Sequence, residues 1–417
     1  MSRVGSTVAP VLPGRSGLAR RVLAASVCTV LWVISCVDVA AGPLPHAAYI
    51  WQRAWHAGVT SSLAVAAAQL DGFIVLAAEI GPSRSHRVAY DSAALAASGS
   101  AIGLALRVNS GAALTEVPAL AAQLVATARS NRLSVAELQL DYDCPESKLG
   151  AYRELVQSVR RRLAPTPVTI TALPSWLRQP AFSNLVAATD GFVLQVHSLD
   201  ASLQLCDGEL ARRAVARAGL SGVPFRVALP TYGHVVATDR DGRVLGIASE
   251  ASIPSWPPHA MLHEVRSDPA MIAGLTRAWN RRPPPHLRGF IWYRLPVDGD
   301  RLNWSWPTLS AVVSGRVPRP DLSLRLRQSR PGLVEIEIAN HGDADAATPI
   351  AISVTWRDAR LLACDALAGF AADASSATDA GTLTFSGRPR LAPAASRAIG
   401  WMRFQDEREV RCEARFD

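Results

Sequence analysis

The sequence has almost no lysine and few aromatic side chains. Lys148 is the only lysine among 43 basic residues, so the formal net charge of +8 comes almost entirely from arginine. The arginines are scattered in short groups and form no basic stripe interleaved with aromatic residues, as nucleic-acid-binding surfaces do. We therefore expect no nucleic-acid partner and interpret the arginines as a solvated basic surface.

Several catalytic motifs are also missing. The sequence contains no GxSxG, no phosphate-cradling glycine loop and no HExxH, which argues against serine hydrolases, nucleotide-dependent enzymes and zinc proteases of that type. No CxxC pair or Cys/His cluster has the spacing of metal ligands. We therefore expect no cofactor and no metal.

The composition is that of a folded protein. With 417 residues, of which 49% are hydrophobic and 19% charged, the chain is longer than one typical domain and unlike a disordered chain. More than one domain is therefore predicted.

Residues 1–42 are typical of an export signal. Arginines precede an apolar run, Val22–Val37, that is shorter than the ~20 residues needed to span a membrane. Val39-Ala40-Ala41 resembles a signal peptidase site, whereas the run ending at Cys36 resembles a bacterial lipobox with a lipidated cysteine. We predict an exported protein, periplasmic or lipid-anchored in the bacterial envelope, with both forms left open. The alternative is an uncleaved membrane anchor.

Four cysteines follow this segment. An even number of cysteines in an oxidising compartment favours disulfides, and three pairings are open. Membership of the same predicted domain favours Cys144 with Cys206 and Cys364 with Cys412.

Residues 46–310 alternate between short apolar runs and helix-like segments, which predicts repeated strand–helix units around a parallel sheet. Eight units over this length are typical of a (β/α)₈ TIM-type barrel, an α/β fold. The expected strands are Ala48–Gln52, Phe73–Glu79, Ala101–Val108, Val135–Asp143, Val168–Leu173, Gly191–His197, Phe225–Tyr232 and Gly289–Leu295. The expected helices include Thr60–Gln69, Val117–Asn131, Lys148–Leu163, Asp207–Ala218 and Pro269–Asn280.

The fourth expected strand carries the most informative pattern. Successive side chains of a strand point to opposite faces, so Glu137, Gln139, Asp141 and Asp143 share one face. The two aspartates are neighbours roughly 6.6 Å apart along the backbone. The wet cavity at the carboxyl end of a barrel accommodates such polar groups, and barrel enzymes place their chemistry there. The alternative is a solvated edge strand with an acidic end.

Other expected strands also end in polar side chains. The same alternation turns Arg107 inward at the end of the third strand, and Glu79 inward after Val75 and Ala77. It likewise turns Gln195 and His197 inward at the end of the sixth. These side chains are predicted to meet at the carboxyl end of the barrel.

The remaining chain looks different. Gly233 to Glu250 is predicted to be a hairpin inserted after the seventh strand. Pro307 to Pro320 is predicted to be a linker, followed by a small β-sandwich over residues 320–417 that contains no helix. Its expected strands are Leu322–Arg327, Leu333–Ala339, Ile350–Trp356, Gly381–Phe385, Ser396–Arg403 and Val410–Phe416.

The run Leu138-Gln139-Leu140-Asp141-Tyr142-Asp143 resembles the fourth strand of family 18 glycoside hydrolases, the chitinase-like enzymes. Leu229-Pro230-Thr231-Tyr232-Gly233 is similar to that family's seventh strand, and Gly289-Phe290-Ile291-Trp292-Tyr293 to its eighth. Three runs together more closely resemble the bacterial domain-of-unknown-function 3142 family, which has no established activity: Trp51-Gln52-Arg53-Ala54-Trp55, Gln139-Leu140-Asp141-Tyr142-Asp143 and Thr171-Ala172-Leu173-Pro174-Ser175-Trp176.

Two adjacent carboxylates in a cavity push their pKa values apart, so one can stay protonated near neutral pH. Asp143, nearer the mouth, is the candidate acid and Asp141 the orienting or stabilising carboxylate, and a separate base or nucleophile is identified only if Glu79 supplies it. Asp143 is one methylene shorter than the acid of family 18, and Gln139 replaces an earlier aspartate. The family's substrate-assisted mechanism is therefore not carried over.

Further side chains are candidates for binding sugar. Trp292 would form the floor of the sugar site by the same resemblance, and flat aromatic faces at other strand ends would stack on sugar rings. Arg107 would pair with Asp141 or with an acidic ligand. The other candidates for contact with sugar are Trp51, Trp176, Tyr232, Gln195 and His197.

The sequence thus predicts an exported, glycoside hydrolase-like protein that acts on an unidentified carbohydrate. The alternative is a non-catalytic glycan-binding or structural protein of the cell envelope. Contact with a membrane is expected only through the signal or a lipid anchor, and the sequence does not indicate an oligomeric state.

Overall fold

The computed structural model describes residues 42–197, 204–248, 255–374, 380–388, 390–405 and 410–417. The predicted export signal and the lipobox cysteine Cys36 lie outside the described residues. Within the described residues, no helix is long and apolar enough to cross a membrane.

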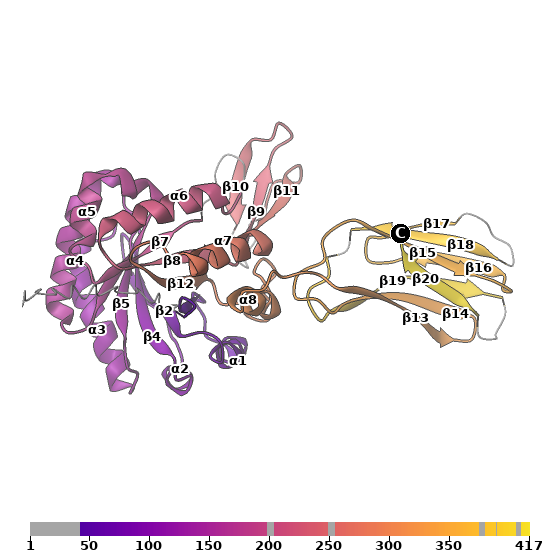
Figure 1. Cartoon of the computed structure of the whole chain (residues 1–417), viewed down its shortest axis with the longest axis horizontal. Helices are drawn as coiled ribbons and strands as arrows, with labels where there is room; N and C mark the ends of the chain where they lie inside the picture. Colours follow the sequence, from indigo (N-terminus) through magenta and orange to yellow (C-terminus); the bar gives the residue numbers. More distant parts are fainter. Residues whose placement is uncertain (1–41, 198–203, 249–254, 375–379, 389, 406–409) are drawn as a thin grey trace, which may run out of the picture. The chain divides into compact units, whose positions relative to one another are not determined.

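A closed parallel barrel forms the first part of the described chain (Figure 1). Within the described residues eight strands run parallel in the order β1-β12-β8-β7-β6-β5-β4-β2, and β1 also pairs with β2 to close the ring. The predicted (β/α)₈ fold is therefore confirmed. The strands are β1 His46–Ile50, β2 Gly72–Ile80, β4 Ala101–Val108, β5 Glu137–Asp141, β6 Val168–Ala172, β7 Gly191–Gln195, β8 Phe225–Pro230 and β12 Leu287–Tyr293.

Helices surround the barrel because each has one apolar face. In α4, for example, Tyr152, Val156 and Val159 are buried, whereas Arg161 and Arg162 are exposed. The α-helices are α1 Ala57–Ala66, α2 Ser92–Ala97, α3 Val117–Ser130, α4 Leu149–Leu163, α5 Pro180–Val186, α6 Gly208–Ala218, α7 Pro269–Arg281 and α8 Trp306–Val313. Short 3₁₀ turns are η1 Leu114–Glu116, η2 Glu146–Lys148, η3 Pro174–Arg178 and η4 Gly219–Ser221.

Strand alternation separates the barrel interior from the helix layer. In β1, Tyr49 belongs to the interior cluster and Ile50 to the cluster beneath the helices. In β2 the prediction was wrong: Ile74 and Leu76 face the interior, whereas Val75 and Ala77 pack toward the helices. The pairing of β2 with β4 shifts between Leu76 and Ala78, and this irregularity brings Glu79 into register with Arg107.

The interior holds a polar layer below the mouth. Arg226 of β8 donates to Glu137 at 2.6 Å, and Thr169 of β6 donates to the same carboxylate at 2.7 Å. Tyr49 donates its hydroxyl to Gln139 at 2.6 Å. These partners satisfy polar groups that would otherwise destabilise a buried layer.

Gly103 makes room for this layer. A Cβ at this position would lie 2.6 Å from the Ile74 side chain and 2.9 Å from that of Glu137. Both contacts are shorter than van der Waals separation, so the crowded barrel axis requires glycine here.

Short strands extend the barrel sheet and form an insertion. β3 Ser85–Arg87 runs antiparallel to β2. The expected hairpin after β8 is present as β9 Gly233–Thr238 and β10 Val244–Ala248, and β11 Met261–Arg266 adds a strand to its other side (Figure 1).

The described part of the C-terminal region contains two antiparallel sheets, ordered β13-β14-β19-β16 and β17-β18-β15-β20. Residues of both sheets, such as Ile336 and Val354, share one buried core. This arrangement is a β-sandwich. Its strands are β13 Leu322–Arg330, β14 Leu333–Asn340, β15 Ile350–Trp356, β16 Leu361–Ala366, β17 Ala371–Ala374, β18 Gly381–Gly387, β19 Ser396–Phe404 and β20 Cys412–Phe416.

The segment expected to be a linker is partly helical. α8 lies within it and buries Leu309 and Val312 in the core beneath the barrel helices. The connection to the sandwich is therefore shorter than predicted: residues 314–315 form a turn after α8, and residues 316–321 have no regular secondary structure. That the barrel and the sandwich fold separately stays a prediction.

The predicted disulfides are wrong. Among the described residues all four cysteines are free. Cys144 follows β5 and Cys206 follows β7, with β6 between these strands, whereas Cys364 and Cys412 lie in different sheets of the sandwich. Cys206 instead donates to the carbonyl oxygen of Val196 at 3.3 Å. Membership of one predicted domain fixes neither the separation nor the direction of two cysteine side chains, so it did not identify a bonded pair.

Candidate active site

A cavity of about 210 Å³ opens at the carboxyl end of the barrel strands. Side chains from β1, β4, β5, β6, β7, β8 and β12, or from the residues that follow them, meet there. The lining residues are Tyr49, Trp51, Arg107, Asp141, Asp143, Thr171, Gln195, His197, Ala228, Tyr232 and Tyr293. The structure thus brings together seven of the residues predicted from sequence: Asp141, Asp143, Arg107, Gln195, His197, Tyr232 and Trp51.

Asp141 is the inner carboxylate of the cavity. It is the last residue of β5 and only 7% exposed, and its Oδ1 accepts a hydrogen bond of 2.8 Å from Thr171. Gln195 donates to the same oxygen at 3.5 Å. Burial is the main reason that the pKa of Asp141 rises to about 6, and the charge of Asp143 adds to the rise. Arg107 and the Thr171 hydrogen bond oppose it.

Asp143 lies two residues beyond Asp141, past the end of β5, and is exposed at the mouth. The cavity walls still desolvate its carboxylate and raise its pKa, whereas Arg107 lowers it. The two aspartates titrate as a coupled pair, so removing a proton from one disfavours its removal from the other.

Arg107 and Glu79 are in register at the ends of β4 and β2. Arg53 holds both oxygens of Glu79, at 2.9 Å and 3.0 Å, and this pairing helps to keep the pKa of Glu79 low although burial raises it. Glu79 is not among the lining residues of the cavity. Arg107 has no ion pair within the described residues, so the expected pairing with Asp141 is not formed as a direct contact.

Aromatic rings form the other wall. Trp51 and Tyr293 meet edge to face with ring centres 5.6 Å apart, and Tyr232 contacts Tyr293 at 5.2 Å. His197 stacks on Tyr293 at 5.7 Å. Burial lowers the pKa of His197 to about 4, although a hydrogen bond with the backbone of Ala228 opposes this, so the ring is neutral near neutral pH.

Two predicted aromatic residues lie elsewhere. Trp292 is fully buried beneath the helices, where its Nε1 donates to Nδ1 of His46 at 3.1 Å. Trp176 is 1% exposed and packs edge to face against Tyr152 of α4. Neither lines the cavity, so the prediction that they contact a ligand there is wrong on geometry.

The lining residues missed from sequence are Tyr49, Thr171, Ala228 and Tyr293. Strand alternation would have found Tyr293, because Gly289 and Ile291 precede it on the inner side of β12 and Trp292 lies on the outer side. Trp292 was predicted as a ligand contact from its resemblance to a family motif, whereas the alternation of side chains along the strand predicts Tyr293.

The chemistry of the cavity is that of carboxylates and aromatic rings. Within the described residues, no group of three or more His, Cys, Asp or Glu side chains is placed to hold a metal ion. The cavity thus combines two neighbouring carboxylates with a wall of aromatic rings. The fold and site thus define a (β/α)₈ barrel with a candidate acid–base centre at its mouth.

Comparison with known families supports the resemblance seen in the sequence. Residues 105–298 match the family model described as "Domain of unknown function (DUF3142)", which confirms that resemblance over most of the barrel. Residues 323–405, in the sandwich, match "Domain of unknown function (DUF8456)". Among curated proteins, no sequence matches this chain.

Solved structures similar to this chain include chitinase-type enzymes. The spore cortex-lytic enzyme SleL of Bacillus megaterium is 12% identical with a TM-score of 0.49, covering 66% of this chain and 74% of its own. A family GH18 chitinase from Chromobacterium violaceum is 11% identical with a TM-score of 0.43, covering 87% and 88%.

Proposed function

We propose that the protein is a glycoside hydrolase-like enzyme that acts on a carbohydrate at the barrel mouth, in the bacterial envelope after export. The observation that carries this proposal is the pair Asp141 and Asp143, which lines the cavity with the inner pKa raised to about 6. Burial also raises the pKa of Asp143, so a proton is held within the pair at higher pH than by free aspartates, and such a proton is what protonation of a glycosidic oxygen requires.

The two carboxylates have different roles in this mechanism. Asp143, exposed at the mouth, gives its proton to the glycosidic oxygen as the bond to the anomeric carbon breaks. With the proton of the pair on Asp143, Asp141 is the charged carboxylate; it accepts the Thr171 hydrogen bond and stabilises the positive charge that develops on the sugar. Because Glu79 is held by Arg53, the group that attacks the anomeric carbon is water, and the proton that this water loses returns to the carboxylate of Asp143.

The aromatic wall supports binding of a sugar. The rings of Trp51, Tyr232 and Tyr293 offer faces and edges to sugar C–H groups. Nε1 of Trp51 and Nδ1 of His197 are buried and have no hydrogen-bond partner within the described residues.

Substitution of Asp143 tests this proposal. Asp143→Asn keeps the side-chain volume but has no proton to donate, so hydrolysis across a panel of glycans should fall by about 10²-fold or more, in line with the loss of a general acid. Its thermal unfolding should change little, because the residue is exposed. Asp298→Asn is the matched control, since Asp298 is also exposed and lies outside the cavity lining.

The outcomes separate a catalytic role from a structural one. Unchanged hydrolysis by Asp143→Asn would refute its role as the acid. No activity of the wild-type protein on any glycan, combined with a marked loss of stability in Asp143→Asn, would mean that the carboxylate stabilises the fold instead.

A non-catalytic glycan-binding protein is the second candidate. It is favoured by the pairing of Glu79 with Arg53, because the cavity lining then contains, among the described residues, no carboxylate beyond the two neighbouring aspartates. This reading expects saturable binding of a glycan without turnover. Binding should weaken in Tyr293→Ala and persist in Asp143→Asn.

A further inference from the structure

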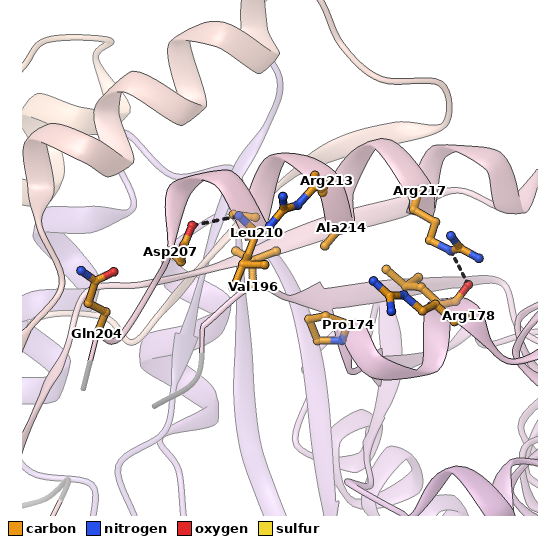
Figure 2. A pocket seen from close by; sticks show the side chains of 11 residues that line it. Pro174, Arg178, Val196, Gln204, Asp207, Leu210, Arg213, Ala214 and Arg217 are labelled. Carbon is orange, nitrogen blue, oxygen red and sulfur yellow. Dashed lines mark hydrogen bonds between the residues drawn. The ribbon is translucent and has the colours of Figure 1, made fainter. Parts of the chain in front are cut away.

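A second groove lies on the outside of the barrel. It has a volume of about 330 Å³ and runs between η3, the end of β7 and α6, and it shares no residue with the candidate active site. Figure 2 shows α6 and η3 contributing most of its labelled side chains. Its lining residues are Pro174, Leu177, Arg178, Val196, Gln204, Asp207, Leu210, Ala211, Arg213, Ala214 and Arg217.

One face of α6 forms a wall of this groove. Leu210, Arg213, Ala214 and Arg217 are three or four residues apart and therefore share a side of the helix (Figure 2). Leu210 is 50% exposed, which leaves an apolar surface beside the two guanidinium groups. Arg178, at the end of η3, supplies a third guanidinium.

The carboxylates that line the groove do not neutralise its positive charge. Asp207 is the only carboxylate among the described lining residues, and it accepts hydrogen bonds from the backbone nitrogens of Glu209 and Leu210 at 2.7 Å and 2.9 Å. Arg217 donates Nε to the carbonyl oxygen of Leu177 at 2.8 Å.

The other two guanidinium groups belong to Arg178 and Arg213. Neither Arg178 nor Arg213 has a hydrogen bond or ion pair within the described residues. Three like charges gathered in this way favour an anion between them.

We propose that this groove binds a carboxylate-bearing oligosaccharide, a segment of an acidic glycan. Guanidinium groups bind carboxylates through two parallel hydrogen bonds, and the aliphatic side chains of Leu177, Val196 and Leu210 suit the C–H faces of sugar rings. The saccharide part of the proposal rests on the proposed function. Val196 lies between Gln195 and His197, which line the candidate active site, so both sites meet at the end of β7.

Calorimetric titration of the whole protein tests this proposal. The probes are an oligogalacturonate and its methyl ester, which has the same sugar backbone without the charges. The oligogalacturonate should bind, and rising salt should weaken its binding because exposed ion pairs are screened. The methyl ester should bind at least about tenfold more weakly, since it cannot form the charged pairs.

Paired variants locate the site. Arg178→Gln with Arg213→Gln should reduce affinity for the oligogalacturonate about tenfold. Arg161→Gln with Arg162→Gln removes the same charge from the exposed end of α4 and should leave affinity unchanged. Thermal unfolding of both double variants checks that they are folded.

Several results would overturn the proposal. One is equal binding of the methyl ester, and another is an equal loss of affinity in the α4 control variant. A third is a loss of affinity in the double variant Asp141→Asn with Asp143→Asn and none in the groove variant, which would move the site to the barrel mouth. Binding of polyglutamate with the same dependence on Arg178 and Arg213 would identify an acidic peptide as the ligand instead. Retained groove binding in a protein that hydrolyses no glycan would leave this inference standing while the proposed function fails.

Discussion

Asp141→Asn should stabilise the protein at alkaline pH. Asp141 has a folded-state pKa of about 6 against its ordinary value of 3.8. Below pH 3.8 the carboxyl is protonated in both the folded and the unfolded chain. The free energy of unfolding is then higher than at a pH where Asp141 is charged. As pH rises through 6 the folded chain must hold a buried charge, and this stability is lost.

The size of the effect follows from the shift. About two pKa units correspond to roughly 3 kcal/mol between pH 4 and pH 8, at about 1.4 kcal/mol per unit. Asparagine cannot ionise, and its carbonyl can still accept the Thr171 hydrogen bond. We therefore expect Asp141→Asn to raise the free energy of unfolding by about 1–3 kcal/mol at pH 8 and to change it little at pH 4.

Urea unfolding at intervals from pH 4 to pH 8 measures this difference. Asp298→Asn, an exposed substitution of the same type, should show no such dependence on pH. Thr171→Val removes the hydrogen bond that lowers the pKa of Asp141, so it should move the loss of stability to higher pH. If Asp141→Asn destabilises the protein equally at pH 4 and pH 8, the carboxyl is not a buried group with a raised pKa.

Two further predictions concern packing and domain structure. Trp292→Ala should destabilise the barrel by about 3–5 kcal/mol because it empties a fully buried site, whereas Tyr293→Ala should mainly reduce glycan binding. Urea unfolding measures the first effect and titration with a glycan the second. The reverse result would contradict the assignment of the two faces of β12. Limited proteolysis should cut first between residues 314 and 321, where the chain forms neither helix nor strand between α8 and β13, and mass spectrometry of the fragments checks this. First cleavage within residues 100–200 would mean that the domain boundary is misplaced.

Much of the barrel could be predicted because its strands carry strong local signals. The run Ala101–Val108 forms β4 with the predicted bounds, and its alternation correctly turned Arg107 toward the cavity. The same periodicity placed Asp141 and Gln195 on one rim. Alternation of side chains is a local property of any strand, so one sequence is enough to read it.

The errors arose where tertiary structure overrides local pattern. The irregularity in β2 changes which residues face inward, and nothing in the run Phe73–Glu79 indicates it. α8 is held by burial of Leu309 and Val312 beneath the barrel helices, although the proline at its start resembled part of a linker. The cysteine pairs failed because sequence gives their number but not the distance between their sulfur atoms.

The unpaired cysteines have a chemical consequence. Burial raises the pKa of Cys144 to about 11, that of Cys412 to about 11 and that of Cys206 to about 12. Only about one molecule in 10⁴ or fewer then exposes a thiolate at any one of these positions at neutral pH, and the thiolate is the species that attacks disulfides. At these three positions the folded chain is therefore slow to exchange with oxidised thiols around it.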